Sequence, residues 1–63
     1  MSVGAKLRKL RGSRSQLEVA NEVGISKSAL AMYERDERVP RDEIKIRLAN
    51  FYGQSVQFIF YSS

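Results

Sequence analysis

Residues 16–35 read QLEVANEVGISKSALAMYER, and this stretch decides the fold. An apolar segment at helical spacing ends at Gly24, and Ser26 then opens a second segment that carries Leu30 and Tyr33 on one face. Gly24 can adopt the left-handed conformation that ends a helix, so the two short helices should cross steeply. This arrangement is typical of a helix-turn-helix, whose second helix lies in the major groove of DNA.

Size and composition exclude most other functions. The chain has 63 residues, without cysteine or histidine, and this length predicts one domain over residues 1–63 with a small core. Because it lacks thiols and imidazoles, we expect no disulfide, no metal, no cofactor and no enzyme. The N-terminus has no apolar signal segment and no stretch is long enough for a membrane, which predicts a cytoplasmic, nucleoid-associated protein.

The charge balance indicates a polyanionic partner. Eleven Lys and Arg residues against seven Asp and Glu residues give a net charge of +4. The first fourteen residues contain no acid and hold Lys6, Arg8, Lys9, Arg11 and Arg14. This distribution favours nucleic acid as the partner over a surface whose charges serve only solubility.

Serines mark the helix starts in the first half of the chain. Each apolar segment follows a serine whose hydroxyl can accept the free amides of a helix N-terminus. The second serine also has a glutamate three residues on, which is the spacing of a capping box. The caps and the helices that they predict are Ser2 for residues 3–11, Ser15 with Glu18 for a helix from residue 16, and Ser26 for residues 27–35.

The second half predicts a loop and a longer helix. Residues 35–40 are charged and have no apolar period, so they predict the loop. Beyond Pro40, two acids suit the first turn of a helix, and Gly53 suits its end. The residues predicted to face inward from this helix are Ile44, Leu48, Ala49, Phe51 and Tyr52.

The C-terminal segment, residues 56–61, follows Ser55 as a possible cap and is rich in aromatic residues. Its β-branched and aromatic content keeps a terminal strand open beside a short helix. As a helix, it would turn inward Val56, Ile59 and Phe60. Phe58 and Tyr61 would then face outward, either in a satellite core or, as we expect, at a homodimer contact, because aromatic residues dominate interface energetics.

Together these features resemble the phage repressor and Cro-type helix-turn-helix domains, often called the Xre family. The resemblance covers roughly residues 7–60. The matching residues are Gln16, Ala20, Gly24, Ile25, Ser26, Leu30, Glu34 and Pro40. It implies an all-α, compact, five-helix, lambda-repressor-like domain with the helix-turn-helix at residues 16–35, which binds operator DNA, usually as a dimer.

The resemblance also implies which residues contact bases. Lys27 and Ser28 in the first turn of the third helix, with Ala31 and Met32 one turn on, match the positions at which the family contacts base edges. Lysine can donate to guanine, serine can donate or accept, and alanine or methionine can pack on a thymine methyl group.

A second group of residues is expected at phosphates or in the minor groove. Gln16 begins the second helix, where the family uses it at the phosphate backbone and where the helix N-terminus adds its own amides. The other candidates are Ser26, Arg35, Arg38 and Arg41. In the family an arginine late in the first helix pairs with the glutamate at the end of the reading helix, so we expect Arg11 and Glu34 to form a structural ion pair.

The sequence departs from the family pattern at three places. The loop before Gln16 is about two residues shorter than usual, and Arg14 stands where a core leucine is common. Asp36 stands where glycine or asparagine is frequent, although aspartate tolerates the left-handed conformation better than most residues. Arg41 replaces the frequent serine or threonine cap of the fourth helix.

We therefore expect a dimeric, sequence-specific transcriptional regulator of double-stranded DNA, a repressor that binds a palindromic operator. One alternative is an antitoxin or anti-repressor module, which would use the aromatic tail on a protein partner and also bind DNA. The other is a binder of nucleic acid without sequence preference.

Overall fold

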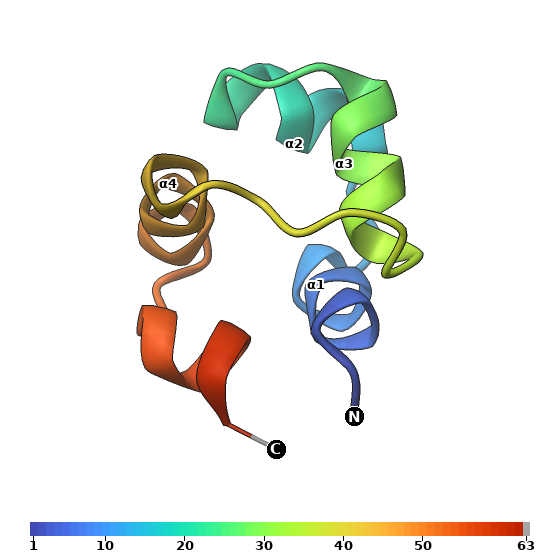
Figure 1. Cartoon of the computed structure of the whole chain (residues 1–63). Coiled ribbons are helices and arrows are strands. Elements are labelled where there is room, and N and C mark those ends of the chain that lie inside the picture. Colours follow the sequence, from blue (N-terminus) through green and yellow to red (C-terminus); the bar gives the residue numbers. More distant parts are fainter. Residues whose placement is uncertain (63) are drawn as a thin grey trace.

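The computed structural model describes residues 1–62 as five helices without a strand (Figure 1). They are α1 (Val3–Arg11), α2 (Gln16–Val23), α3 (Lys27–Glu34), α4 (Asp42–Tyr52) and the π-helix η1 (Gln57–Tyr61). The all-α, five-helix prediction is confirmed, and the alternative of a terminal strand is wrong. No helix formed by these residues is long and apolar enough to cross a membrane.

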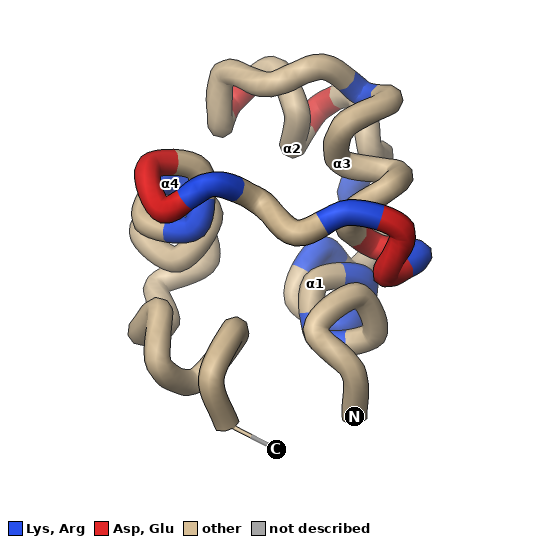
Figure 2. The backbone as a smooth tube through the Cα atoms, viewed as in Figure 1, with Lys and Arg blue, Asp and Glu red and all other residues tan. Residues whose placement is uncertain are grey.

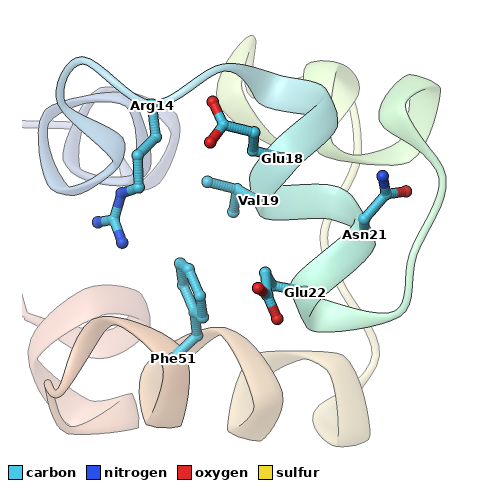
Figure 3. A pocket seen from close by; sticks show the side chains of 6 residues that line it. All are labelled: Arg14, Glu18, Val19, Asn21, Glu22 and Phe51. Carbon is cyan, nitrogen blue, oxygen red and sulfur yellow. The ribbon is translucent and has the colours of Figure 1, made fainter.

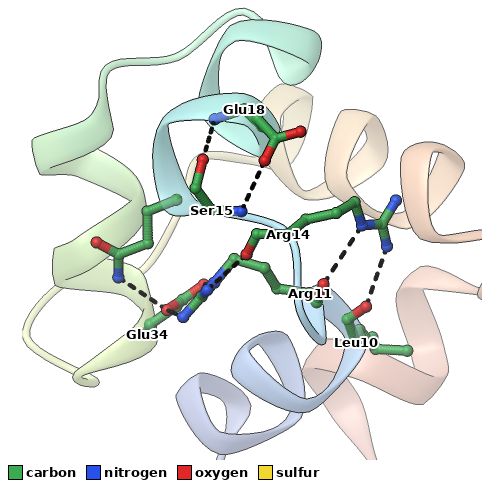
Figure 4. Close-up of polar contacts among 7 residues, drawn as sticks. Leu10, Arg11, Arg14, Ser15, Glu18 and Glu34 are labelled. Atoms are coloured by element: carbon green, nitrogen blue, oxygen red, sulfur yellow. Dashed lines mark hydrogen bonds and ion pairs between the residues drawn. The ribbon is translucent and has the colours of Figure 1, made fainter.

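Serine side chains cap the first three helices as predicted. Ser15 Oγ accepts from the Glu18 amide at 3.0 Å, and the Glu18 carboxylate accepts from the Ser15 amide at 3.1 Å, which completes the capping box (Figure 4). Ser2 and Ser26 each accept from an amide three residues on. Helix α4 has no side-chain cap, because Arg41 stands at that position.

Gly24 makes the corner between α2 and α3. Its φ of 84° is left-handed, and the amides of Gly24 and Ile25 both donate to the Ala20 carbonyl at 2.9 Å. These two bonds use a carbonyl that would otherwise lack a partner at the end of α2. The chain therefore turns within two residues, and α3 runs in a clearly different direction from α2 (Figure 1).

The core lies between the four α-helices and is closed from below by η1 in the view of Figure 1. Leu7, Leu30, Leu48 and Ile59 come from four different helices, and each is 0% exposed. Val19 and Ala20 of α2 are also 0% exposed. These residues hold the two short helices of the corner against the rest of the chain, because burial of apolar surface is the main stabilising term in a domain of this size.

The predicted inward face of α4 is confirmed, with Phe51 and Tyr52 as its half-buried edge, packed against the core. The guanidinium carbon of Arg14 lies 4.9 Å and 5.7 Å from their ring centroids. The same guanidinium donates to the carbonyls of Leu10 and Arg11 at the end of α1 (Figure 4). Arg14 thus covers the rings with a cation where the family pattern has a core leucine.

Helix α1 meets the end of α3 by direct backbone contact. A Cβ atom on Gly4 would lie 2.7 Å from the backbone carbonyl carbon of Glu34, so only glycine fits there. Asp36 accepts the Gly4 amide at 2.9 Å and has the left-handed φ of 60° that aspartate tolerates. This bond, with a smaller contribution from the Ser2 hydroxyl, holds the pKa of Asp36 below its ordinary value.

The basic stretch at the start of the chain is mostly used inside the domain. Lys6 is 8% exposed and donates to backbone carbonyls of the C-terminal segment. Arg11 pairs with Glu34, and Arg14 lies over aromatic rings. Arg8 and Lys9 remain exposed. The expectation of a basic N-terminal stretch facing a polyanion is therefore wrong for Lys6, because its ammonium group is buried and hydrogen-bonded inside the domain.

Candidate nucleic-acid interface

A shallow groove runs along the exposed side of α3. It brings together all four residues expected at base edges and two of those expected at phosphates. Its lining consists of Gln16, Lys27, Ser28, Ala31, Met32 and Arg35. Lys27 and Ser28 are exposed, whereas Ala31 and Met32 are half-buried and form its apolar part.

The order of side chains along this groove suits the edge of a base pair. Lys27 and Arg35 stand at its two ends, roughly two turns or about 12 Å apart along the helix axis. Between them lie a hydroxyl, a methyl group and a thioether. A cation and a hydroxyl can pair with base acceptors, and the apolar part can contact a thymine methyl group.

Gln16 is held at the edge of the groove by a buried ion pair. Glu34 accepts from Arg11 Nε at 2.8 Å and from Arg11 Nη2 at 3.0 Å, which confirms the predicted pair. Gln16 Nε2 also donates to Glu34, at 2.9 Å. One amide N–H and the amide oxygen of Gln16 remain for another partner. The orientation of this side chain is thus set by a contact that sequence reasoning missed.

The remaining phosphate candidates lie around a second hollow, on the other side of α3. Its lining includes Ser26, Arg38 and Arg41, together with Arg47 from α4. Ser26 Oγ accepts from the Ala29 amide at 3.0 Å, so its hydroxyl proton is still free to donate. Sequence reasoning missed Arg47, because its place beside the corner comes from the packing of α4 and no local pattern marks it.

Arg35 is already paired at the surface. Its Nη2 lies 2.9 Å from the Glu37 carboxylate, and this bond raises the pKa of Arg35 and lowers the pKa of Glu37. Both side chains are more than half exposed, at 58% and 53%. An exposed pair of this kind contributes little and exchanges easily, so Arg35 can turn to a phosphate at small cost.

The acids of α2 define the side of the domain that does not suit DNA. Glu18 and Glu22 line a separate hollow between α2 and α4, with Arg14 and Phe51 at its edge (Figure 3). Two carboxylates repel phosphates, and one arginine that is already stacked on a ring does not offset them. Most of the other charges visible along the backbone lie on α1, on the 35–41 loop and at the start of α4 (Figure 2).

Nearly the whole chain matches one known protein family. A family model described as helix-turn-helix matches residues 5–59. The chain belongs to this helix-turn-helix family. The match spans the corner, the groove and most of η1, and it confirms the predicted membership. The helix-turn-helix itself is formed by α2, the Gly24 corner and α3.

Relatives of this helix-turn-helix domain include two regulators. The cryptic phage CTXphi transcriptional repressor RstR of Vibrio cholerae is 41% identical over 51 residues, which cover 78% of this chain and 46% of that protein. The HTH-type transcriptional regulator ImmR of Bacillus subtilis (strain 168) is 33% identical over 61 residues, which cover 94% and 48%. The chain thus spans about half the length of the curated relatives it matches.

Among solved structures, the helix-turn-helix domain is similar to the P22 c2 repressor protein, crystallised in complex with the synthetic operator 9T in the presence of Tl+. The TM-score is 0.94 at 23% sequence identity, and the match covers 100% of this chain and 98% of that chain. At this identity, the similarity shows the fold.

Proposed function

We propose that this domain is a sequence-specific DNA-binding module of a transcriptional repressor, with α3 in the major groove. The observation that carries the proposal is the groove along α3, where Lys27, Ser28, Ala31 and Met32 lie together beside Gln16. Its relatives RstR, a phage transcriptional repressor, and ImmR, an HTH-type transcriptional regulator, support the same function. Occupation of a promoter would then exclude the transcription machinery.

Base reading and phosphate contact are assigned to different elements. Lys27 and Ser28 read base edges, and Ala31 and Met32 supply the apolar contact with thymine. The phosphates on one side are met by Gln16 and Arg35. Those on the other side are met by the residues around the second hollow, which are Ser26, Arg38, Arg41 and Arg47. Contacts on both sides fix the position of α3 across the groove.

We also propose that the domain acts as a homodimer on a palindromic operator. Phe58 and Tyr61 are 48% and 58% exposed on η1, and large exposed aromatic rings favour an interface. A two-fold dimer would place two α3 helices on half-sites about one turn of DNA apart. Its double-stranded target would then have the same symmetry as the protein.

The same exposed aromatic residues support a second candidate function. Phe58 and Tyr61 could bind a different protein, as in an antitoxin or anti-repressor module that also binds DNA. Co-purification of a stoichiometric second protein, lost in the Phe58→Ser/Tyr61→Ser variant, would favour this candidate over a homodimer.

Two substitutions with a matched control test the base-reading assignment. Lys27→Ala should lose about 1–3 kcal/mol on the preferred duplex and relax preference at one base position. Gln16→Ala should weaken all duplexes by a similar factor. Lys9→Ala removes the same charge from an exposed position on α1 and should preserve the preference. Equal losses on preferred and random duplexes for Lys27→Ala would reduce Lys27 to a phosphate contact.

A further inference from the structure

The ammonium group of Lys6 is buried against the C-terminal segment. Its Nζ donates to the carbonyl oxygens of Phe58 at 3.0 Å, Ile59 at 3.2 Å and Ser62 at 2.6 Å. It also lies 3.2 Å from Ser62 Oγ and 5.7 Å from the centroid of the Phe58 ring. No Asp or Glu side chain among residues 1–62 forms an ion pair with it.

Phe58 and Ile59 lie in η1, and their carbonyls are among those that a helix leaves without backbone partners at its C-terminal end. Ser62 follows the helix directly, and its hydroxyl also donates to the Phe58 carbonyl. A cation there donates hydrogen bonds and also meets the negative end of the helix dipole. A single ammonium with three donors can serve the carbonyls of Phe58, Ile59 and Ser62 at once. Lys6 therefore caps the C-terminal end of η1 from outside, beside the C-cap residue Ser62, although it comes from α1, more than fifty positions earlier in the chain.

Helix η1 needs such outside support. It has five residues and the π-helical pattern, and an isolated helix of that length is unstable in water. Ile59 anchors η1 in the core, and Ser55 Oγ accepts from the Phe58 amide at 2.9 Å. Lys45 of α4 adds a contact, because its Nζ donates to Tyr61 Oη at 2.8 Å and lies 4.8 Å from the Tyr61 ring centroid. Lys6 and Lys45 thus add polar contacts from two helices to the segment that carries Phe58 and Tyr61.

We propose that Lys6 is a positioning residue for Phe58 and Tyr61, the exposed aromatic residues of η1 that the proposed homodimer contact uses. Its ammonium fixes the backbone at Phe58 and Ile59, so that the Phe58 and Tyr61 rings are presented outward in one arrangement. Without it, η1 frays while the α-helical core persists. The link to self-association rests on the proposed homodimer. The capping role of Lys6 stands on the contacts of this chain alone.

Hydrogen exchange separates the capping role from general stability. Lys6→Met keeps the apolar stem and removes the donors, and Lys9→Met is the matched control from the exposed side of α1. Amides of residues 59–62 should exchange at least about tenfold faster in Lys6→Met than in the wild type, since a charged hydrogen bond is worth about that factor or more. The Leu30 amide should still exchange only by global unfolding. Tail amides as protected as in the wild type would overturn the proposal.

Sedimentation and half-site binding then test the link to the interface. Lys6→Met should weaken self-association about tenfold, leave the affinity of the monomer for a half-site unchanged, and be rescued in part by Lys6→Arg. Faster amide exchange at residues 59–62 in Lys6→Met, together with unchanged self-association, would overturn the positioning role. If the wild type stays monomeric, and the amides of residues 59–62 exchange faster only in Lys6→Met, the homodimer would be overturned and the capping role supported.

A measurement on the wild type covers the case in which Lys6→Met does not fold. Nitrogen-detected NMR of the lysine ammonium groups should show slow solvent exchange at Lys6, with scalar couplings across hydrogen bonds to the carbonyl carbons of Phe58 and Ile59. An ammonium signal that exchanges as fast as that of exposed Lys9 would overturn the proposal.

Discussion

The buried ion pair gives the sharpest test of what holds the reading helix in place. The Glu34 side chain is 1% exposed and the Arg11 side chain 19% exposed. If Arg11 is replaced by methionine, the Glu34 carboxylate stays buried and keeps one hydrogen-bond donor, Gln16. If Glu34 is replaced by glutamine, Arg11 keeps partial contact with water and its bond to the Arg14 carbonyl at 2.8 Å. The two substitutions are therefore unequal.

Their magnitudes follow from what each leaves unpaired. A buried charge that loses its partner costs about 3–5 kcal/mol, which is about the whole stability expected of a domain this small. Arg11→Met should therefore be largely unfolded at 25 °C. Glu34→Gln should cost about 1–3 kcal/mol, because the charge left behind reaches water. In the double variant both positions are neutral, so its cost should be less than the sum.

Urea unfolding followed by far-ultraviolet circular dichroism measures all four members of this cycle. An excluded osmolyte added at one concentration throughout keeps Arg11→Met folded enough to fit. Strictly additive losses would refute direct coupling between the two side chains. An Arg11→Met variant no less stable than Glu34→Gln would refute the argument from burial.

Three further substitutions test single contacts. Gly4→Ala should lose about 1–3 kcal/mol in thermal unfolding, because its Cβ meets the backbone of Glu34; unchanged stability would mean that α1 can move away. The lowered pKa of Asp36 implies stability that is present above about pH 4 and is lost as pH falls through the lower folded value. Asp36→Asn should flatten that part of the melting-temperature profile, and an unchanged profile would contradict the bond to Gly4. The Tyr52 hydroxyl is buried without a partner among residues 1–62, so Tyr52→Phe should be neutral or stabilising by up to about 1 kcal/mol, and a clear loss in urea unfolding would show a missed bond.

Local patterns were enough to predict the four α-helices. Ser2, Ser15 and Ser26 cap by contacts within three residues of themselves, and Gly24 adopts the left-handed conformation that its place after an apolar segment indicates. The four residues of α3 that line the groove were predicted from the resemblance to the repressor family, and they belong to one helix, whose period places them on one face.

Contacts between distant segments could not be predicted in this way. Asp36 reaches Gly4 across 32 positions, and Lys6 reaches Ser62 across 56. Charge composition does not distinguish Lys6 from exposed Lys9 and assigned both to the surface. Arg47 joins the second hollow only because α4 packs beside the corner. The π-helical form of η1 likewise depends on contacts with other helices.

The central claim is that α3 reads a specific sequence in the major groove. Selection of bound duplexes from a random pool, repeated with Lys27→Ala, tests it most directly. We expect an enriched palindrome with half-sites about one turn of DNA apart, and a relaxed preference at one symmetric position in the variant. A pool without enrichment, or the same palindrome recovered unchanged with Lys27→Ala, would contradict it.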